Sequence, residues 1–195
     1  MRIRKLALLG VPVLALVAAL PLTATAGGAQ HVRWDIISLQ GGAPPGPLNP
    51  GGHASAMAPD GDTITLTGTG TFVAPAGSNG GSGAVTGGGT WRTDTASGTY
   101  QVKELVTFVM ANPQSSTPAF IDNIGALSQR ANGTAVLRIR FSDGESGVLT
   151  VGCHGPGAPP GIFEGIATTK GFKTYYEAQD PVGGVDANRT IFHVR

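Results

Sequence analysis

Apolar and polar residues alternate with a period of two along most of the chain, which predicts β-strands. The clearest example is 63–73, TITLTGTGTFV, where threonine occupies every odd position from 63 to 71. The even positions hold small or apolar residues, so this segment predicts a strand with one apolar face. We interpret the threonine row as a solvated face of high β propensity, with an ice-binding face as the alternative.

The same alternation predicts further strands, joined mostly by short turns rich in Gly, Pro and Asp. They lie at 30–39, 52–58, 83–92, 97–110, 134–141, 147–153, 162–169, 172–178 and 190–194. Inward glycines recur in 63–73 and 83–92, and indicate either tightly coiled strands or a thin-walled cavity. We predict an all-β fold, a single antiparallel β-barrel of about eight strands, because closure leaves no exposed edges. A β-sandwich is the alternative.

The segment 111–133 interrupts the strand pattern. It contains Pro113 and Pro118, and a short apolar group at near-helical spacing formed by Phe120, Ile121, Ile124 and Leu127. We expect a short helix or a lid-like excursion between two strands.

The first 26 residues have the three parts of a secretory signal peptide. Three basic residues stand within the first five, residues 6–22 are apolar, and 24–26 is the small-residue cleavage pattern ATA. We therefore expect a secreted, extracellular or cell-envelope protein with no membrane span after signal removal. A single β-barrel-like domain would then occupy 27–195.

Removal of the signal peptide leaves 169 of the 195 residues and changes the charge balance. The signal peptide holds three of the 13 Lys and Arg residues and none of the 12 Asp and Glu residues, which leaves a net charge of −2. A domain of this size buries roughly 70% of its unfolded surface and needs no disulfide to hold a core. The sequence has no cluster of basic and aromatic residues, which argues against nucleic acid as a partner.

Cys153 is the only cysteine and stands beside His154, which raises the question of a Cys-His catalytic pair. Neighbouring side chains on a strand point to opposite faces, so the two groups are separated and Cys153 is expected to be a buried thiol. The other histidines, His31, His53 and His193, form no short metal-binding motif. We expect no metal and no cofactor, since a phosphate-binding glycine motif is also missing from the sequence.

Two glutamates are the candidate site residues. Glu104 stands among the even, apolar positions of 97–110, where an inward carboxylate would have a raised pKa suited to acid–base chemistry. A bulge that turns Glu104 outward, or pairing with an arginine, explains a carboxylate at this position as well, and we favour these two explanations. Glu164 lies in IFEGIATT, where parity allows an inward carboxylate that pairs with Glu104 or, as we favour, a surface residue.

Residues 149–153, LTVGC, precede a Gly/Pro-rich turn and then GIFEG at 161–165. This strand, turn and strand resembles a region near the end of allene oxide cyclases and, more loosely, of dirigent proteins, over about 25 of the 169 residues. The resemblance implies an eight-stranded antiparallel barrel, often trimeric and without a cofactor, whose apolar cavity holds and steers a reactive intermediate. It also implies that Glu164 is a turn or pocket carboxylate.

Three classes of function fit these observations. The first, which we favour, is a non-catalytic secreted module that binds a small apolar ligand or a surface partner, since no convincing catalytic set is present. The second is a cofactor-free isomerase or cyclase in which Glu104 and Glu164 form the acid–base pair. The third is a structural envelope protein without a site. Oligomeric state, substrate and partner are not encoded in any pattern of the sequence.

Overall fold

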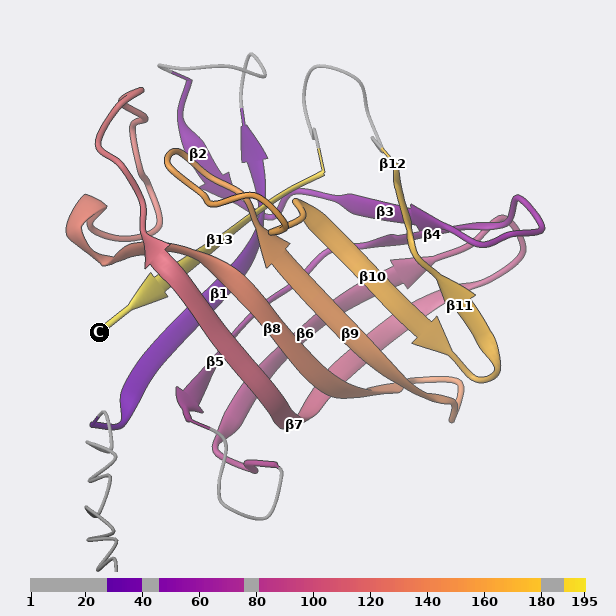
Figure 1. Ribbon diagram of the computed structural model, residues 1–195. Coiled ribbons are helices and arrows are strands. Elements are labelled where there is room, and N and C mark those ends of the chain that lie inside the picture. The colour runs from indigo at the N-terminus through magenta and orange to yellow at the C-terminus, as the bar shows by residue number, and fades with distance from the viewer. Residues whose placement is uncertain (1–27, 40–45, 76–80, 180–187) are drawn as a thin grey trace, which may run out of the picture.

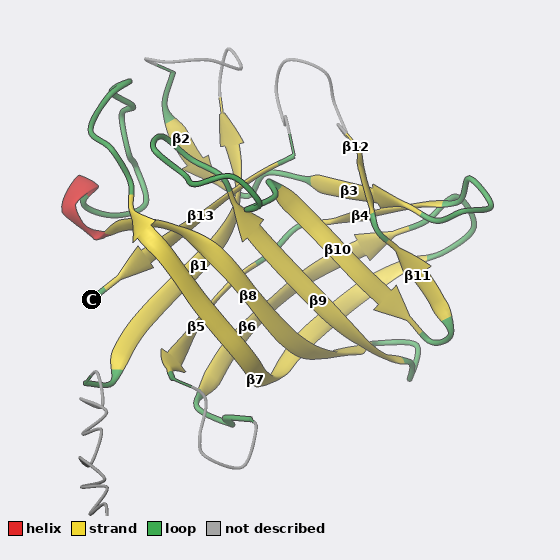
Figure 2. Cartoon of the chain, in the orientation of Figure 1, coloured by secondary structure: helices red, strands yellow, loops and turns green. Residues whose placement is uncertain are grey.

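The computed structural model describes residues 28–39, 46–75, 81–179 and 188–195. The predicted signal peptide and the Pro/Gly/Asp-rich segment at 180–187 lie outside these residues. Most of the described chain is β-strand, joined by loops and turns (Figure 2), with one 3-10 turn at Leu127–Gln129. Among the described residues, no helix is long and apolar enough to cross a membrane.

Six antiparallel strands close into a barrel (Figure 1). Around the ring they are β1 (Gln30–Leu39), β5 (Thr69–Ala74), β6 (Val85–Arg92), β7 (Ser97–Pro113), β8 (Arg130–Phe141) and β13 (Arg189–Val194). The predicted all-β antiparallel barrel is confirmed. The closed ring has six strands where the prediction had about eight, because several predicted strands extend the sheet beyond the ring.

Two groups of strands continue the sheet from the barrel. From β8 it continues through β9 (Ser146–Cys153), β10 (Gly165–Lys170) and β11 (Lys173–Tyr175). From β6 it continues through β4 (Thr63–Leu66), β3 (Ala54–Met57) and β12 (Glu177–Gln179), and the short β2 (Leu48–Pro50) pairs with β1. Tyr176, between β11 and β12, donates a backbone hydrogen bond to Met57 at 3.1 Å, which ties the two extensions together.

The barrel interior is packed with side chains. Val32, Trp34 and Ile36 of β1 point inward, as the alternation predicts, and all three are buried. The ring of Phe108 packs between those of Phe72 and Phe192, at centroid distances of 5.1 and 5.2 Å. These aromatic rings thus occupy this part of the barrel interior.

The inward glycines make room for these aromatic side chains. A β-carbon on Gly68 would lie 2.1 Å from Oη of Tyr100, and one on Gly70 would lie 2.7 Å from Nε1 of Trp34. Neither glycine can therefore be replaced without moving an aromatic residue of the core. Close approach of large core residues thus accounts for glycine at these two positions, and it is a separate explanation from the coiled strands or thin-walled cavity expected from the sequence.

The threonine row lies on the outer face, as expected. The Oγ1 atoms of Thr67 and Thr90 lie 2.8 Å apart, and those of Thr71 and Thr86 are also 2.8 Å apart. These hydroxyls bind one another across β-strands, which is typical of a stabilising cross-strand pair. Exposure of Thr69 and Thr71 agrees with a solvated face.

β7 departs from simple alternation because its register with β8 shifts between Val102 and Glu104 and again between Leu105 and Thr107. Leu105 is buried as a result, whereas Val106, predicted to face inward, is only half-buried. Each irregularity exchanges the two faces of the strand. The first one also moves Glu104 away from the interior.

A second apolar cluster lies outside the barrel wall. It is built from Ile37 and Leu39 of β1, Leu48 of β2 and Ile191 of β13, with Phe120 and Ile124 packed against it. Phe120 and Ile124 belong to the segment between β7 and β8, which we call the 114–126 segment. The expected lid-like excursion is thus present, and it covers the outer face of β1 and β13 without forming a helix there.

Candidate functional site

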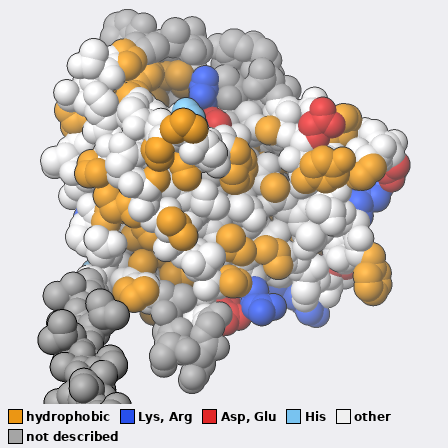
Figure 3. Space-filling model, viewed as in Figure 1, with side chains coloured by type: hydrophobic (Ala, Val, Ile, Leu, Met, Phe, Trp, Pro, Cys, Tyr) orange, Lys and Arg blue, Asp and Glu red, His pale blue; other side chains and the backbone are white. Residues whose placement is uncertain are grey.

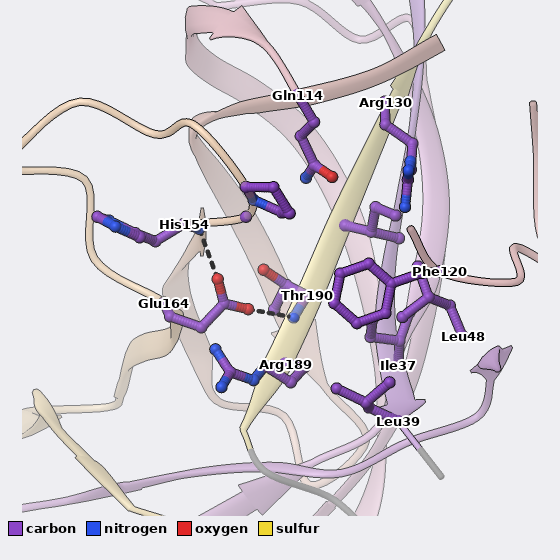
Figure 4. Close-up of a pocket in the computed structure, with 13 residues that line it drawn as sticks. Ile37, Leu39, Leu48, Gln114, Phe120, Arg130, His154, Glu164, Arg189 and Thr190 are labelled. Atoms are coloured by element: carbon purple, nitrogen blue, oxygen red, sulfur yellow. Dashed lines mark hydrogen bonds between the residues drawn. The ribbon is translucent and has the colours of Figure 1, made fainter. Parts of the chain in front are cut away.

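A cavity of about 180 Å³ lies between the outer face of β1 and β13 and the segments that cover it. We call it the outer cavity (Figure 4). Its lining residues come from six parts of the chain and are Ile37, Leu39, Leu48, Gln114, Phe120, Arg130, His154, Gly155, Pro156, Glu164, Arg189, Thr190 and Ile191. An engineered cavity of roughly 150 Å³ is large enough for benzene, so the outer cavity suits a small, ring-sized ligand.

One wall of the outer cavity is apolar. Ile37, Leu39, Leu48 and Ile191 are each at most 5% exposed, and the ring of Phe120 completes this wall. Figure 4 shows Ile37, Leu39, Leu48 and Phe120 grouped on one side of β13, and Glu164 and Arg189 on the other side. An apolar wall facing a few polar groups is typical of small-molecule sites.

Glu164 provides the carboxylate of the outer cavity. Its two oxygens accept backbone N–H groups from Thr190 at 2.7 Å and from His154 at 2.5 Å. Burial raises the pKa of Glu164 to about 7, even though those two hydrogen bonds and the positive charge of Arg189 each lower it. Glu164 can therefore exchange a proton near neutral pH, as a general acid or base must.

The segment from His154 to Glu164 forms one edge of the cavity and is fastened to the end of β7. Oδ1 of Asn132 accepts the N–H of Gly155 at 2.8 Å, and Nδ2 of Asn112 donates to the carbonyl of Gly157 at 2.8 Å. Gly157 has φ of +81°, a conformation that favours glycine. The Gly/Pro-rich composition of this segment thus permits a tight loop whose shape is held by side chains of β7 and β8.

Arg130 is the second charged group of the lining, and it is 1% exposed. Nε, Nη1 and Nη2 all lack a hydrogen-bond partner among the described residues. Oδ2 of Asp122 lies 3.9 Å from Nε, beyond hydrogen-bond distance, and the ring of Phe120 lies 5.9 Å from Cζ. A buried guanidinium normally has hydrogen-bond acceptors, so the three unpaired nitrogens of Arg130 are hydrogen-bonding capacity that the described residues leave unsatisfied.

Asp122 is occupied by other donors. Oδ2 lies 2.9 Å from Nε2 of the buried His193, and Oδ1 accepts the backbone N–H groups of Ile124 and Gly125. Burial acts to raise the pKa of Asp122, but these hydrogen bonds outweigh it and the pKa lies below its usual value. Asp122 therefore supplies a negative charge near Arg130 and holds the 114–126 segment on β13, without saturating the guanidinium.

Arg189 brings a second cation to the outer cavity, beside Glu164. Its Nε is buried and has no hydrogen-bond partner among the described residues. The cavity thus has a cation near each end, a titratable carboxylate and an apolar wall. Such a lining can hold a small ligand with one charged end and can exchange a proton with it.

The structure separates the two predicted glutamates. Glu164 lines the outer cavity and is not the surface residue that we favoured, because it precedes β10 instead of alternating within it. Glu104 does not line this cavity: its Oε2 lies 2.9 Å from Nε of Arg138, and a bulge turns it outward. Both explanations that we favoured for Glu104 thus apply together.

Cys153 and His154 lie on opposite faces at the end of β9. Cys153 is buried, burial raises the pKa of its thiol, and Nε2 of Gln114 donates to Sγ at 3.2 Å. His154 is exposed, and its Nδ1 lies 2.5 Å from the carbonyl oxygen of Ile162. The predicted buried thiol is confirmed, and the two side chains form no dyad. The described residues include no group of three or more His, Cys, Asp or Glu side chains that could hold a metal ion.

Three residues of the site were not anticipated from the sequence: Arg130, Arg189 and Asp122. Alternation along β8 places Arg130 on the outer face, where an arginine is expected to be solvated. In the structure Arg130 is buried, and Asp122 and Phe120 of the 114–126 segment lie against it. The apolar residues Phe120 and Ile124 were the available signal, since a covering segment must bury them against something.

Comparisons with protein-family models, with curated proteins and with solved structures found no match for this chain. Figure 3 shows basic, histidine and acidic atoms next to one another beside hydrophobic atoms at the upper edge of that face, and further charged atoms at its lower and right-hand edges. The geometry of the outer cavity is therefore the basis for a functional proposal.

Proposed function

We propose that this chain is a secreted β-barrel module that binds a small ligand with an apolar body in the outer cavity. The observation that carries the proposal is the apolar wall of Ile37, Leu39, Leu48, Phe120 and Ile191 facing a few charged groups. The packed barrel interior supports the same location, because the aromatic side chains of the described strands leave little space for a ligand inside the barrel. Secretion follows from the signal-peptide pattern of the first 26 residues.

Filling the cavity with protein atoms tests this proposal. Leu48→Trp adds a large ring at a lining position of the short strand β2. Val109→Trp adds the same ring to β7 at a side chain that is 58% exposed and outside the lining. We expect the wild type and Val109→Trp to retain a small molecule in native mass spectrometry of the secreted protein, and Leu48→Trp to lose it.

The result also separates binding from a purely structural role. Repeated recovery of the wild type without any small molecule, together with no response to a panel of ring-sized apolar compounds, would favour a structural envelope protein. Equal retention by Leu48→Trp and Val109→Trp would place the ligand elsewhere.

A cofactor-free isomerase or cyclase is the second candidate, and one observation favours it: the pKa of Glu164 lies at about 7 beside an apolar wall. Glu164 would act alone as acid and base, since Glu104 is paired with Arg138. The test is deuterium incorporation from D2O into a recovered ligand. Incorporation by the wild type that is lost in Glu164→Gln supports catalysis, and equal incorporation by both excludes Glu164 from it.

A further inference from the structure

Two arginines of the outer cavity have side-chain donors without a hydrogen-bond partner among the described residues. Arg130 is 1% exposed, lines the cavity, and has no hydrogen-bond partner for Nε, Nη1 or Nη2 within the described ranges. Arg189, at the other end, has a buried Nε in the same condition. Leaving a buried charged donor unpaired is costly, and a bound acceptor removes that cost.

The nearby carboxylates do not fill this role. Oδ2 of Asp122 lies 3.9 Å from Nε of Arg130. The carboxylate oxygens of Asp122 are already hydrogen-bonded to His193 and to the backbone N–H groups of Ile124 and Gly125. The carboxylate oxygens of Glu164 accept hydrogen bonds from the backbone N–H groups of Thr190 and His154. The guanidinium of Arg130 therefore keeps its planar, forked set of donors unpaired and buried at the cavity wall.

We infer that the ligand of the outer cavity is a small monocarboxylate whose carboxylate binds Arg130 and whose apolar body lies against Ile37, Leu48 and Phe120. The inference rests on the proposed function and specifies the class of ligand. A carboxylate matches a single guanidinium fork with two parallel hydrogen bonds. The cavity of about 180 Å³ restricts the body to the size of one ring or a short chain.

Isothermal titration calorimetry of the full secreted chain with benzoate, benzamide and acetate tests the inference. Benzoate and benzamide share one ring and differ in charge, whereas acetate has the charge without the ring. We expect benzoate to bind about tenfold tighter or more than benzamide, which is the size of a charge-assisted hydrogen bond, and acetate to bind more weakly than benzoate.

Variants at two arginines of β8 locate the effect. Arg130→Met removes the fork and is expected to abolish the preference for benzoate over benzamide, while Arg130→Lys retains the charge and part of the preference. Arg140→Met is the matched control, because Arg140 lies on the same strand, is exposed and donates to Ser146 at 3.0 Å. If Arg130→Met fails to fold, the wild-type preference and Arg130→Lys still decide the matter.

The outcomes distinguish the inference from the proposed function. Equal affinity of wild type for benzoate and benzamide, or a benzoate preference that survives in Arg130→Met, would overturn the carboxylate assignment while leaving an apolar site. Tighter binding of inorganic phosphate than of benzoate would also overturn it. No binding of either ring compound, or acetate binding as tightly as benzoate, would reject the apolar site itself.

Discussion

The two faces of β1 and β13 differ in role: the inner face forms the barrel core, and the outer face borders the outer cavity. On the inner face, Trp34, Ile36 and Phe192 are fully buried within the aromatic core. On the outer face, Ile37 and Ile191 are just as buried, yet they border a cavity with charged groups. Burial of a side chain alone therefore does not distinguish a core from a site. The two faces differ in packing: core side chains fill the inner face, whereas the segments that cover the outer face leave a cavity against it.

Neighbouring isoleucines on β1 give the largest expected effects. Ile36 points into the barrel and Ile37 toward the outer cavity, and they are 0% and 3% exposed. We expect Ile36→Ala to lower the free energy of unfolding by about 4 kcal/mol and Ile37→Ala by about 2 kcal/mol, because a residue that borders a cavity loses fewer packing contacts. Urea denaturation measures both. Equal costs would show that the outer face is packed as tightly as the inner one.

Substitution of Asp122 tests whether its charged carboxylate holds the 114–126 segment on the outer face. Asp122→Ala removes the acceptor for His193 and for two backbone N–H groups, and it takes a negative charge from near Arg130. We expect a loss of about 3 kcal/mol in the free energy of unfolding, as for other buried ion pairs that lose one partner. The exposed Asp94→Ala is the control, with a change below about 0.5 kcal/mol. A loss as small as that of the control would mean that apolar contacts alone hold the 114–126 segment.

The inner face was more predictable from the sequence than the outer one. Alternation along β1 identifies Val32, Trp34 and Ile36 as core residues, because successive side chains of a strand point to opposite faces and the pattern lies within the strand itself. The burial of Arg130 depends instead on how the preceding 114–126 segment packs over the outer face, and the alternation along β8 does not contain that information. Glu104 and Glu164 fall between these cases. A bulge changes the parity of β7, and Gly165, at φ of +101°, begins β10 just after Glu164.

The titration of Glu164 gives the next smaller effect. Its pKa of about 7 in the folded chain lies above the ordinary glutamate value of 4.5, so the folded state holds the proton more tightly. The stabilisation from this group is complete below the unfolded pKa and is lost as pH rises through about 7. The charged and titratable groups that face it are Arg189 on β13, His154 after β9 and Cys153 on β9.

Glu164→Gln should therefore flatten the pH dependence of stability. Between pH 5 and pH 8 the wild type is expected to lose about 2 kcal/mol more than the variant in free energy of unfolding. Urea denaturation at several pH values for both proteins isolates this difference, since all other groups titrate in each. Parallel curves would show that Glu164 is ionised throughout this range, and the acid–base alternative would lose its support.

Glu104 gives the smallest expected effect and completes the comparison of the two glutamates. Its pairing with Arg138 lies on the outer surface, where the Arg138 side chain is 60% exposed and that of Glu104 is 35% exposed. Exposed ion pairs of this kind contribute only about 0–1 kcal/mol, so Glu104→Gln should change the free energy of unfolding by less than about 0.5 kcal/mol. It should also leave benzoate binding unchanged, because Glu104 is not part of the lining. A loss of binding in Glu104→Gln would mean that the two glutamates act together after all, and would restore the paired acid–base mechanism that their separation argues against.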